Sequence, residues 1–434
     1  MALRIAVAHY CTMRPPVILR LPMSTDHLQQ ASVRGMGRDG TTTVMLVVLC
    51  QLVHSLTFSA MPLLLPLIRE DLRISFTQAG LLSAVATFSY ALGQIPAGYL
   101  SDRFGPRRLY FIGLMGWSVF SLAFGLIHAF WLAVITQFLA GAFRALLFAP
   151  GLSLLASWFP RERRATAISL YMVGGFAGTI LLSLGGPLLT ALYGWRAAFI
   201  FFAALGLVSA VVYRRYAREN PHTPISQSLV LADVVQLFRH PLMWVCNGLQ
   251  FVRFAVVTAF MFWLPSLLMV DRGLSVQTTG LIIAMSAAFT AISNLLGSYV
   301  SDRLRNPPLI IGSALLVLAC ASALLVTVES IPLLLLVIAV NSIFLQFYFG
   351  PLFIVPMEIL GSRVAGTATG VSNLFANIGG FLAAYALGVV KDKSGNFTWG
   401  FIGISMICLI GVALTVVLAR MRTRALAAQQ RHGQ

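Results

Sequence analysis

The chain has 434 residues, of which 58% are hydrophobic and only 10% are charged. Soluble globular domains carry about 25% charged residues, so this composition excludes an ordinary soluble globule and indicates a membrane protein. The net charge is +17, and where the charges fall along the chain matters more than their sum. The five cysteines are scattered without a CxxC spacing, so neither a disulfide framework nor a metal site is predicted.

Apolar runs bounded by charged or turn residues predict twelve membrane-spanning helices, each near the length of about 20 residues that a span requires. The predicted spans lie near residues 44–67, 77–99, 109–127, 131–158, 166–192, 197–213, 242–270, 278–300, 308–328, 332–356, 366–390 and 399–418. The predicted parts are a disordered cytoplasmic tail (1–42), a first six-helix bundle (43–213), a cytoplasmic central loop (214–241), a second bundle (242–420) and a cytoplasmic tail (421–434). The expected fold class is an all-α membrane protein.

The positions of Lys and Arg predict how the chain is oriented in the membrane. Of the 30 Lys and Arg residues, 22 fall in the two tails and in the loops of one side, and six fall in the loops of the other side. Because positive residues concentrate on the cytoplasmic side, both termini are expected in the cytoplasm, with the protein in the cell membrane. The excess charge therefore reflects topology, and no nucleic-acid partner is predicted.

The two halves of the chain repeat. When Gly80 is placed on Gly280, the 24 positions that begin with these glycines contain eight identities and end on Ser-Asp-Arg in both halves. Helices 1 and 7 align when Pro66 is placed on Pro265. Duplicated halves of this kind place a central cavity at their interface near the bilayer midplane, so the predicted architecture is two pseudo-symmetric bundles around a transport pathway.

The loop between spans two and three carries a family resemblance. Its sequence, residues 98–108, reads GYLSDRFGPRR and is similar to the signature loop of the major facilitator superfamily, with a weaker echo at residues 298–303. The resemblance implies bundles that rock about a central site, with this loop acting in gating. Gly98 and Gly105 would permit close approach and a tight turn. The residues expected to act in gating are Gly98, Asp102, Arg103, Gly105, Arg107, Arg108, Asp302 and Arg303.

Three further segments resemble one branch of that superfamily. Residues 157–165 (SWFPRERRA), 194–196 (GWR) and 358–370 are similar to the anion:cation symporter branch, which moves sugar acids and other organic anions. The span-five antiporter signature of drug exporters is only half present, because Gly186-Pro187 is followed by Leu188-Leu189-Thr190. The resemblance therefore favours an organic anion over a drug as substrate.

Three basic or potentially basic residues lie deep within predicted spans: His54, Arg144 and Arg253. An ionisable group at this depth costs at least about 2.5 kcal/mol for Arg and is a functional-site hypothesis by default. No carboxylate occurs at comparable depth in the sequence. Since a guanidinium matches a carboxylate or phosphate bidentately, we expect the two arginines to hold an anionic substrate. The alternative is that each is satisfied by helix carbonyls or extends toward the membrane surface.

The coupling mode follows from the same residues. By the resemblance, Arg144 falls where several relatives of the branch carry the Glu that takes up the coupling proton. A neutral histidine has a pKa near physiological pH, so His54 is the candidate for proton coupling, with packing as its alternative role. Anion exchange or uniport fits the missing carboxylate equally well.

Other polar residues in the spans are expected to line the substrate site, or else to join helices by hydrogen bonds. Asn247 and Gln250 precede Arg253 at helical spacing, and Asn373 and Asn377 are one turn apart. The complete predicted substrate site is Arg144, Arg253, His54, Gln51, Asn247, Gln250, Asn373, Asn377 and Tyr348.

The predicted function is secondary active transport of a small organic anion, such as a sugar acid or a mono- or dicarboxylate, by alternating access. Coupling is by proton symport or anion exchange. The alternatives are a multidrug or metabolite exporter and a non-transporting sensor with the same fold. The sequence lacks HExxH, GxSxG and phosphate-loop motifs, so neither an enzyme nor a cofactor is predicted. The expected partners are the anionic substrate and the lipid bilayer, and the chain is expected to be a monomer.

Overall fold

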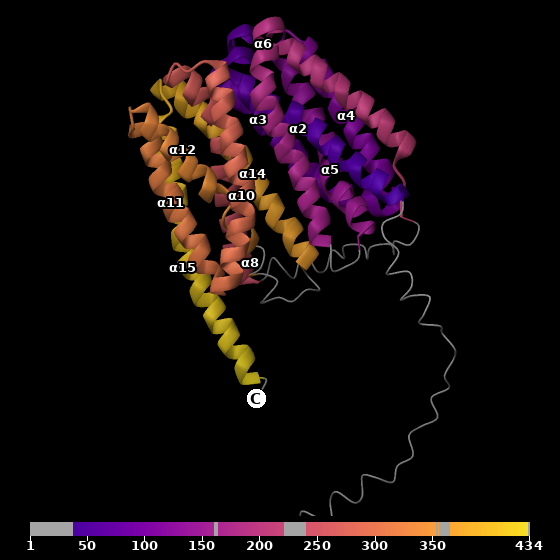
Figure 1. The fold of residues 1–434 in the computed structure, drawn as a ribbon. Coiled ribbons are helices and arrows are strands. Elements are labelled where there is room, and N and C mark those ends of the chain that lie inside the picture. The colour runs from indigo at the N-terminus through magenta and orange to yellow at the C-terminus, as the bar shows by residue number, and fades with distance from the viewer. Residues whose placement is uncertain (1–37, 160–163, 221–239, 353–354, 356–364, 433–434) are drawn as a thin grey trace, which may run out of the picture. The chain divides into compact units, whose positions relative to one another are not determined.

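The structure, a computed structural model, describes residues 38–159, 164–220, 240–352, 355 and 365–432, which are almost entirely helical (Figure 1). The first half contains α2 (Arg38–Leu72), α3 (Phe76–Phe104), α4 (Pro106–Leu126), α5 (Phe130–Ser157) and α6 (Arg164–Tyr216). The second half contains α8 (Pro241–Thr258), η2 (Ala259–Trp263), α9 (Leu264–Ser266), η3 (Leu267–Asp271), α10 (Val276–Leu304), α11 (Pro307–Thr327), α12 (Ile331–Leu345), α14 (Ala365–Ser394) and α15 (Thr398–His432).

Ten helices among the described residues are long and apolar enough to cross a membrane. One of them, α6, joins two spans through Gly194, whose φ of 80° interrupts the helix. The segments α8 to η3 form one run from Pro241 to Asp271 with two π-helical turns. Together with α3, which has the same length as its partner α10, these segments account for the twelve predicted spans.

The sequence repeat is reproduced in the helix ends of the two halves. Ser75 caps α3 by accepting a hydrogen bond from the Gln78 amide, and Ser275 caps α10 by accepting one from Thr278. Ser and Thr side chains stabilise helix starts in this way by about 1 kcal/mol. At the other end, both α3 and α10 stop at a residue of positive φ, which is Gly105 (84°) in the first half. A repeated pair of caps fixes the two helices at the same length.

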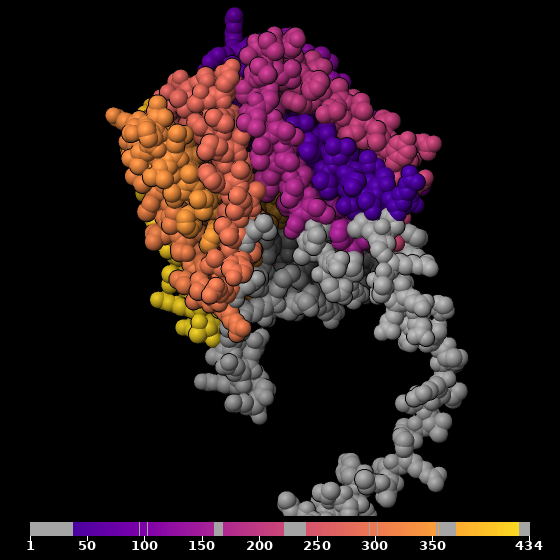
Figure 2. Space-filling view, in the orientation of Figure 1, coloured from indigo at the N-terminus to yellow at the C-terminus, as the bar shows by residue number. Residues whose placement is uncertain are grey.

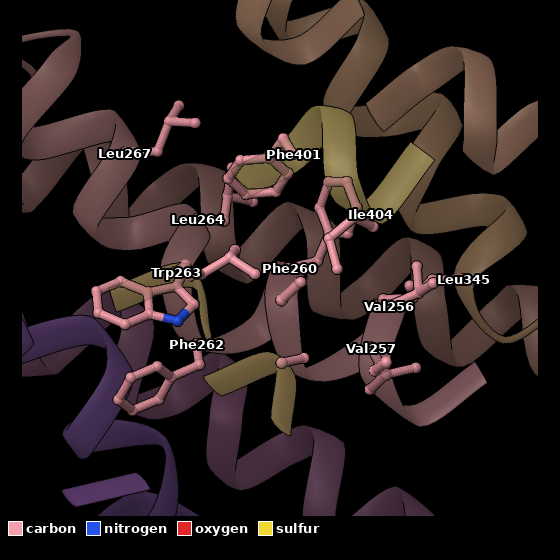
Figure 3. Close-up of a cluster of buried hydrophobic side chains, with 14 of the residues drawn as sticks. Val256, Val257, Phe260, Phe262, Trp263, Leu264, Leu267, Leu345, Phe401 and Ile404 are labelled. Carbon is pink, nitrogen blue, oxygen red and sulfur yellow. The ribbon is translucent and has the colours of Figure 1, made fainter. Parts of the chain in front are cut away.

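Buried apolar side chains fill the helix contacts in both halves. The larger hydrophobic cluster includes Leu64 and Leu182 from the first half together with Trp263 from the second. Figure 3 shows part of this cluster, where Phe260 packs against Phe401 with ring centroids 5.3 Å apart. Burial of an aromatic or aliphatic side chain stabilises a helix contact whatever the orientation of its neighbour, so this packing holds the bundles without specifying a ligand.

The two halves meet along a few helix pairs, in which α3 packs against α14 and α6 against α10. Figure 2 shows the atoms of α6 and α10 in contact along the upper part of the molecule. The repeat-related glycines lie in these contacts: an added β-carbon at Gly80 would come within 2.6 Å of the Ala384 carbonyl oxygen, and one at Gly280 within 2.2 Å of that of Ser183. Only glycine allows such close backbone approach. We refer to the end of the bundles where α2 ends and α3 begins as the closed end.

Candidate functional site

The three predicted membrane residues lie in the middle of their helices. His54 on α2, Arg144 on α5 and Arg253 in the run from α8 to η3 are each at least twelve residues from either helix end. At 1.5 Å per residue this places each of them about 18 Å or more from the helix ends. The prediction that these groups share one depth is consistent with their positions in the helices.

Arg144 contacts two aromatic rings. Its Cζ atom is 4.0 Å from the centroid of the Phe58 ring on α2 and 4.4 Å from that of the Tyr90 ring on α3. Each such contact is worth about 0.5–2 kcal/mol, more when the cation is desolvated. Arg144 makes no hydrogen bond or ion pair with a described residue, yet it keeps part of its surface exposed. The rings stabilise the cation without neutralising it, so its N–H groups remain available to a ligand.

His54 belongs to the same cluster through Phe58. Its ring is stacked on Phe58 with centroids 6.1 Å apart and lies 4.8 Å from the ring of Trp117. His54 is 6% exposed, and neither ring nitrogen has a hydrogen-bond partner among the described residues. The Trp117 indole donates to Thr57, one turn along α2, which fixes the aromatic side of the cluster. A buried imidazole with two unpartnered nitrogens carries hydrogen-bonding capacity that the surrounding residues leave unused.

Arg253 has a more polar setting in the second half. Its Nε donates to Gln250 Oε1 at 2.8 Å, and Cζ lies 5.0 Å from the Phe349 ring and 5.6 Å from that of Phe254. The side chain is buried, at 4% exposure. The neighbouring Tyr348 is completely buried, and its hydroxyl has no partner among the described residues. Gln250 therefore orients Arg253, and no carboxylate in the described part of the chain pairs with its charge.

Among the described residues, the charges at the closed end include ion pairs, whereas the arginines in the middle of the helices do not form any. Both ion pairs found there, Arg196 with Asp71 and Lys391 with Asp271, lie at the closed end. Neither Arg144 nor Arg253 takes part in one. An unpaired buried cation is costly, so a bound anion would stabilise whichever of these guanidinium groups it contacts.

Amide side chains connect the Arg144 half to the other half. Asn373 on α14 donates to Gln94 Oε1 on α3 at 2.7 Å, and Gln94 is one turn from Tyr90. Asn377 donates to the Asn373 carbonyl oxygen, and its own Oδ1 is buried without a partner in the described part of the chain. The structure therefore brings Asn373 to the contact between α3 and α14, while the hydrogen bond of Asn377 stays within α14.

The remaining predicted site residues differ in their surroundings. Asn247 on α8 accepts a hydrogen bond from Ser372 on α14 at 2.9 Å, so it joins two helices of the same half. Gln51, one turn before His54, has a buried Oε1 that lacks a partner among the described residues. Asn247 thus acts as a helix contact in this structure, whereas Gln51 retains an unused acceptor.

The predicted gating loop packs within the first half. Gly105 has φ 84°, and an added β-carbon would lie 2.6 Å from Glu219 Oε1. The Arg107 amide donates to the same carboxylate, and its guanidinium donates to the Arg214 carbonyl oxygen at the end of α6. Around Gly98 the described residues leave open space, so the expected close approach does not explain that glycine.

The other predicted gating residues are exposed or have side chains outside the described part of the structure. Arg103, Arg108 and Arg303 are exposed. Asp102 and Asp302 lie in the last turns of α3 and α10, and their side chains are outside the described part of the structure. Their expected role in gating stays a prediction.

Sequence reasoning missed a cross-bundle contact at the closed end. Asp392 lies beyond the predicted span 366–390, but in the structure it is in the last turn of α14. Its carboxylate accepts hydrogen bonds from the Phe76 and Thr77 amides, at 2.9 and 2.7 Å, at the start of α3. The predicted span ended too early because Lys391 and Asp392 are polar, although the helix itself continues to Ser394.

The Phe58 and Tyr90 contacts were also missed. Tyr90 and Gln94 are polar residues one turn apart in the middle of a predicted span, and this spacing was an available signal. No comparable signal marks Phe58, because aromatic side chains are common in membrane helices. Its contact with Arg144 depends on how α2 is rotated about its axis relative to α5.

Comparison with known proteins is consistent with this architecture. The sequence profile of the Major Facilitator Superfamily matches residues 47–384. A probable galactarate/D-glucarate transporter of Escherichia coli (strain K12) is 26% identical over 393 residues, which cover 80% of this chain and 86% of that protein. A hexuronate transporter of Bacillus subtilis (strain 168) is 24% identical over 392 residues, covering 84% and 91% of the respective chains.

One solved structure shows the same fold. The crystal structure of a bacterial homologue of the human lysosomal transporter Spinster, in an inward-facing and unoccupied conformation, matches with a TM-score of 0.77. The sequences are 20% identical, and the match covers 90% of this chain and 99% of that one. The predicted fold class, twelve spanning helices in two related bundles, is confirmed.

Proposed function

Because the chain belongs to the Major Facilitator Superfamily, we propose that it carries a small organic anion across the cell membrane by alternating access. The observation that carries this proposal is that Arg144 and Arg253, in the middle of their helices, have no ion-pair partner among the described residues. Binding an anion between the bundles neutralises cations that the described residues leave without a counter-ion.

Sugar acids are the substrate class that we propose. The relatives named above carry the names of galactarate, D-glucarate and hexuronate transporters. These molecules combine one or two carboxylates with several hydroxyl groups. Gln51 and Asn377 present buried oxygens without partners among the described residues, and such acceptors suit substrate hydroxyls. The exporter alternative would favour a cavity without fixed charge.

The orientation and the state of assembly complete the proposal. By the positive-inside rule, both termini face the cytoplasm, so the closed end faces the outside. The bundles are placed at residues 43–213 and 242–420. One chain contains both halves of the proposed site, which suits a monomer.

Two coupling modes follow from the residues present. Proton symport would use His54, whose ring nitrogens have no partner among the described residues. Anion exchange would need no titratable group, because a second anion would accompany the return of Arg144 and Arg253. In proteoliposomes, symport makes uptake depend on an imposed pH gradient, whereas exchange makes it depend on anion preloaded inside.

The substrate test is uptake of labelled D-glucarate and D-galacturonate by the purified protein in proteoliposomes, with neutral D-glucitol and cationic ethidium as comparisons. We expect uptake of at least one of the acids and neither comparison compound. Arg144→Gln should abolish this uptake, while Arg420→Gln, a change at an exposed residue of α15, should leave it intact. Transport of ethidium without transport of any acid would contradict the proposal in favour of an exporter.

A further inference from the structure

The aromatic rings around Arg144 define which edge of its guanidinium a ligand can reach. Phe58 and Tyr90 lie 4.0 and 4.4 Å from Cζ, on α2 and α3 respectively. The two rings come from different helices, and no ring contact joins them among the described residues. A guanidinium with a ring on each face offers a ligand its N–H groups only within its own plane.

We propose that Phe58 and Tyr90 cover the two faces of the Arg144 guanidinium and form a slot that makes Arg144 select planar carboxylates over tetrahedral oxyanions. This inference rests on the proposed function, because it assumes that Arg144 binds the substrate anion. In a bidentate pair with a carboxylate, both oxygens and the carbon lie in the guanidinium plane. A sulfonate or phosphonate that places two oxygens in that plane projects its third oxygen and its carbon out of it, toward the rings.

The two rings contribute differently to the slot. Phe58 also packs against His54 and Trp117, so replacing it disturbs the whole cluster. Tyr90 is buried, at 8% exposure, and covers the other side of Arg144 from a different helix. Substitution of Tyr90 should therefore disturb fewer other contacts than substitution of Phe58. Both Phe58 and Tyr90 are positioning residues that act through Arg144.

The unpaired state of Arg144 makes the slot necessary. A guanidinium that is held by carboxylates has its orientation set by them, but no described carboxylate pairs with Arg144. The rings are the groups that fix its plane. Loss of one ring should leave the cation in place, free to tilt and to accept a bulkier anion.

The test compares two anions of equal charge and similar size, 3-hydroxypropionate and isethionate, which differ in a planar carboxylate against a tetrahedral sulfonate. Their binding is measured by titration calorimetry on the purified full chain. The wild type should bind 3-hydroxypropionate at least about tenfold more tightly, a ratio within reach of steric discrimination. Tyr90→Leu should reduce the ratio to about threefold or less by strengthening isethionate binding, and Tyr90→Phe, which keeps the ring, should preserve it.

The outcomes separate the inference from the function on which it rests. If the wild type binds both anions equally, or if neither Tyr90→Leu nor Phe58→Leu changes the ratio, the slot is refuted while transport of anions stands. If the wild type binds neither anion but takes up D-glucarate, the slot is refuted and the proposed function stands. If Arg144→Gln binds both anions and takes up D-glucarate as the wild type does, Arg144 is not an anion site, and the basis of the proposed function fails with the inference. A melting curve for each variant shows whether a loss of binding reflects a loss of folded protein.

Discussion

The middle of the membrane and the closed end treat charge in opposite ways. At the closed end, Lys391 pairs with Asp271, and Arg196 pairs with Asp71. In the middle, Arg144 is covered by two aromatic rings and Arg253 is held by a neutral amide. Paired charges contribute to structure, whereas a cation that is held in place without a counter-ion is ready to bind one. The difference predicts that changes in the middle reduce transport and changes at the closed end reduce stability.

Arg144→Gln should have the largest effect. Its loss removes a bidentate, charge-assisted contact with the substrate and should weaken binding about 100-fold, or ~2.7 kcal/mol. Because no described residue depends on Arg144 for a hydrogen bond or ion pair, the melting temperature should stay within about 2 °C of the wild-type value. Calorimetry with the transported acid and a melting curve measure the two quantities.

Arg420→Gln is the matched control, since it removes the same charge from an exposed position on α15. A large fall in melting temperature for Arg144→Gln, with unchanged affinity, would reverse the comparison and make Arg144 a structural residue.

Lys391→Met should show the reverse pattern. It leaves Asp271, a partly buried carboxylate with 20% side-chain exposure, without its cation. Breaking a fully buried pair costs 3–5 kcal/mol, but Asp271 still accepts a hydrogen bond from the Phe397 amide. We expect a loss of ~2 kcal/mol in stability with little change in substrate affinity.

The exposed Lys393→Met is the control for charge, and Asp271→Asn combined with Lys391→Met should recover part of the loss. A melting curve identical to that of Lys393→Met would mean that the pair does not stabilise the closed end.

Arg253→Gln sharpens the comparison within the middle itself. Arg253 is more buried than Arg144 and already donates to Gln250, so less of its hydrogen-bonding capacity is left for a ligand. We expect affinity to fall about tenfold, or ~1.4 kcal/mol. An effect equal to that of Arg144→Gln would show that the two arginines share the anion evenly.

The positions of the helices could be predicted from sequence, but their ends could not always be. Hydropathy changes where the membrane ends, which is also where many helices end, as at α5, Phe130–Ser157, predicted over 131–158. The last span was predicted to end at 418, but α15 continues to His432, because polar residues leave the membrane without leaving the helix. The tenth span was predicted over 332–356. It runs from Ile331 at least to Leu352, although a turn at residues 346–348 interrupts the helix after Leu345.

The depth of the site residues could be predicted, but their neighbours could not. A charge at the middle of a long apolar run, such as Arg144, must lie deep because the helix rise is fixed. Which side chains face it depends on the rotation of three helices about their axes. That rotation is set by contacts such as Gly141 of α5, where an added β-carbon would lie 2.2 Å from the Ala86 carbonyl oxygen of α3. No periodicity within one helix specifies such a contact.

Asp392→Asn should have the smallest effect and tests whether the closed end can open. The carboxylate accepts two amide hydrogen bonds from the start of α3, in the other half, and a negative group there also gains from the helix dipole. The neutral asparagine side chain has one acceptor oxygen and no charge, so it keeps at most part of these interactions. The population in which the bundles are separated at this end should therefore rise about threefold, which corresponds to a change of ~0.7 kcal/mol in the free energy of separation. Spin labels at Glu70 and Lys393, exposed residues of the two halves, report the change as a larger population of long distances. Asp392→Glu, which retains the charge, should shift the population less. An unchanged distance distribution would mean that the glycine contacts, such as that of Gly80 with Ala384, hold the end closed without the carboxylate.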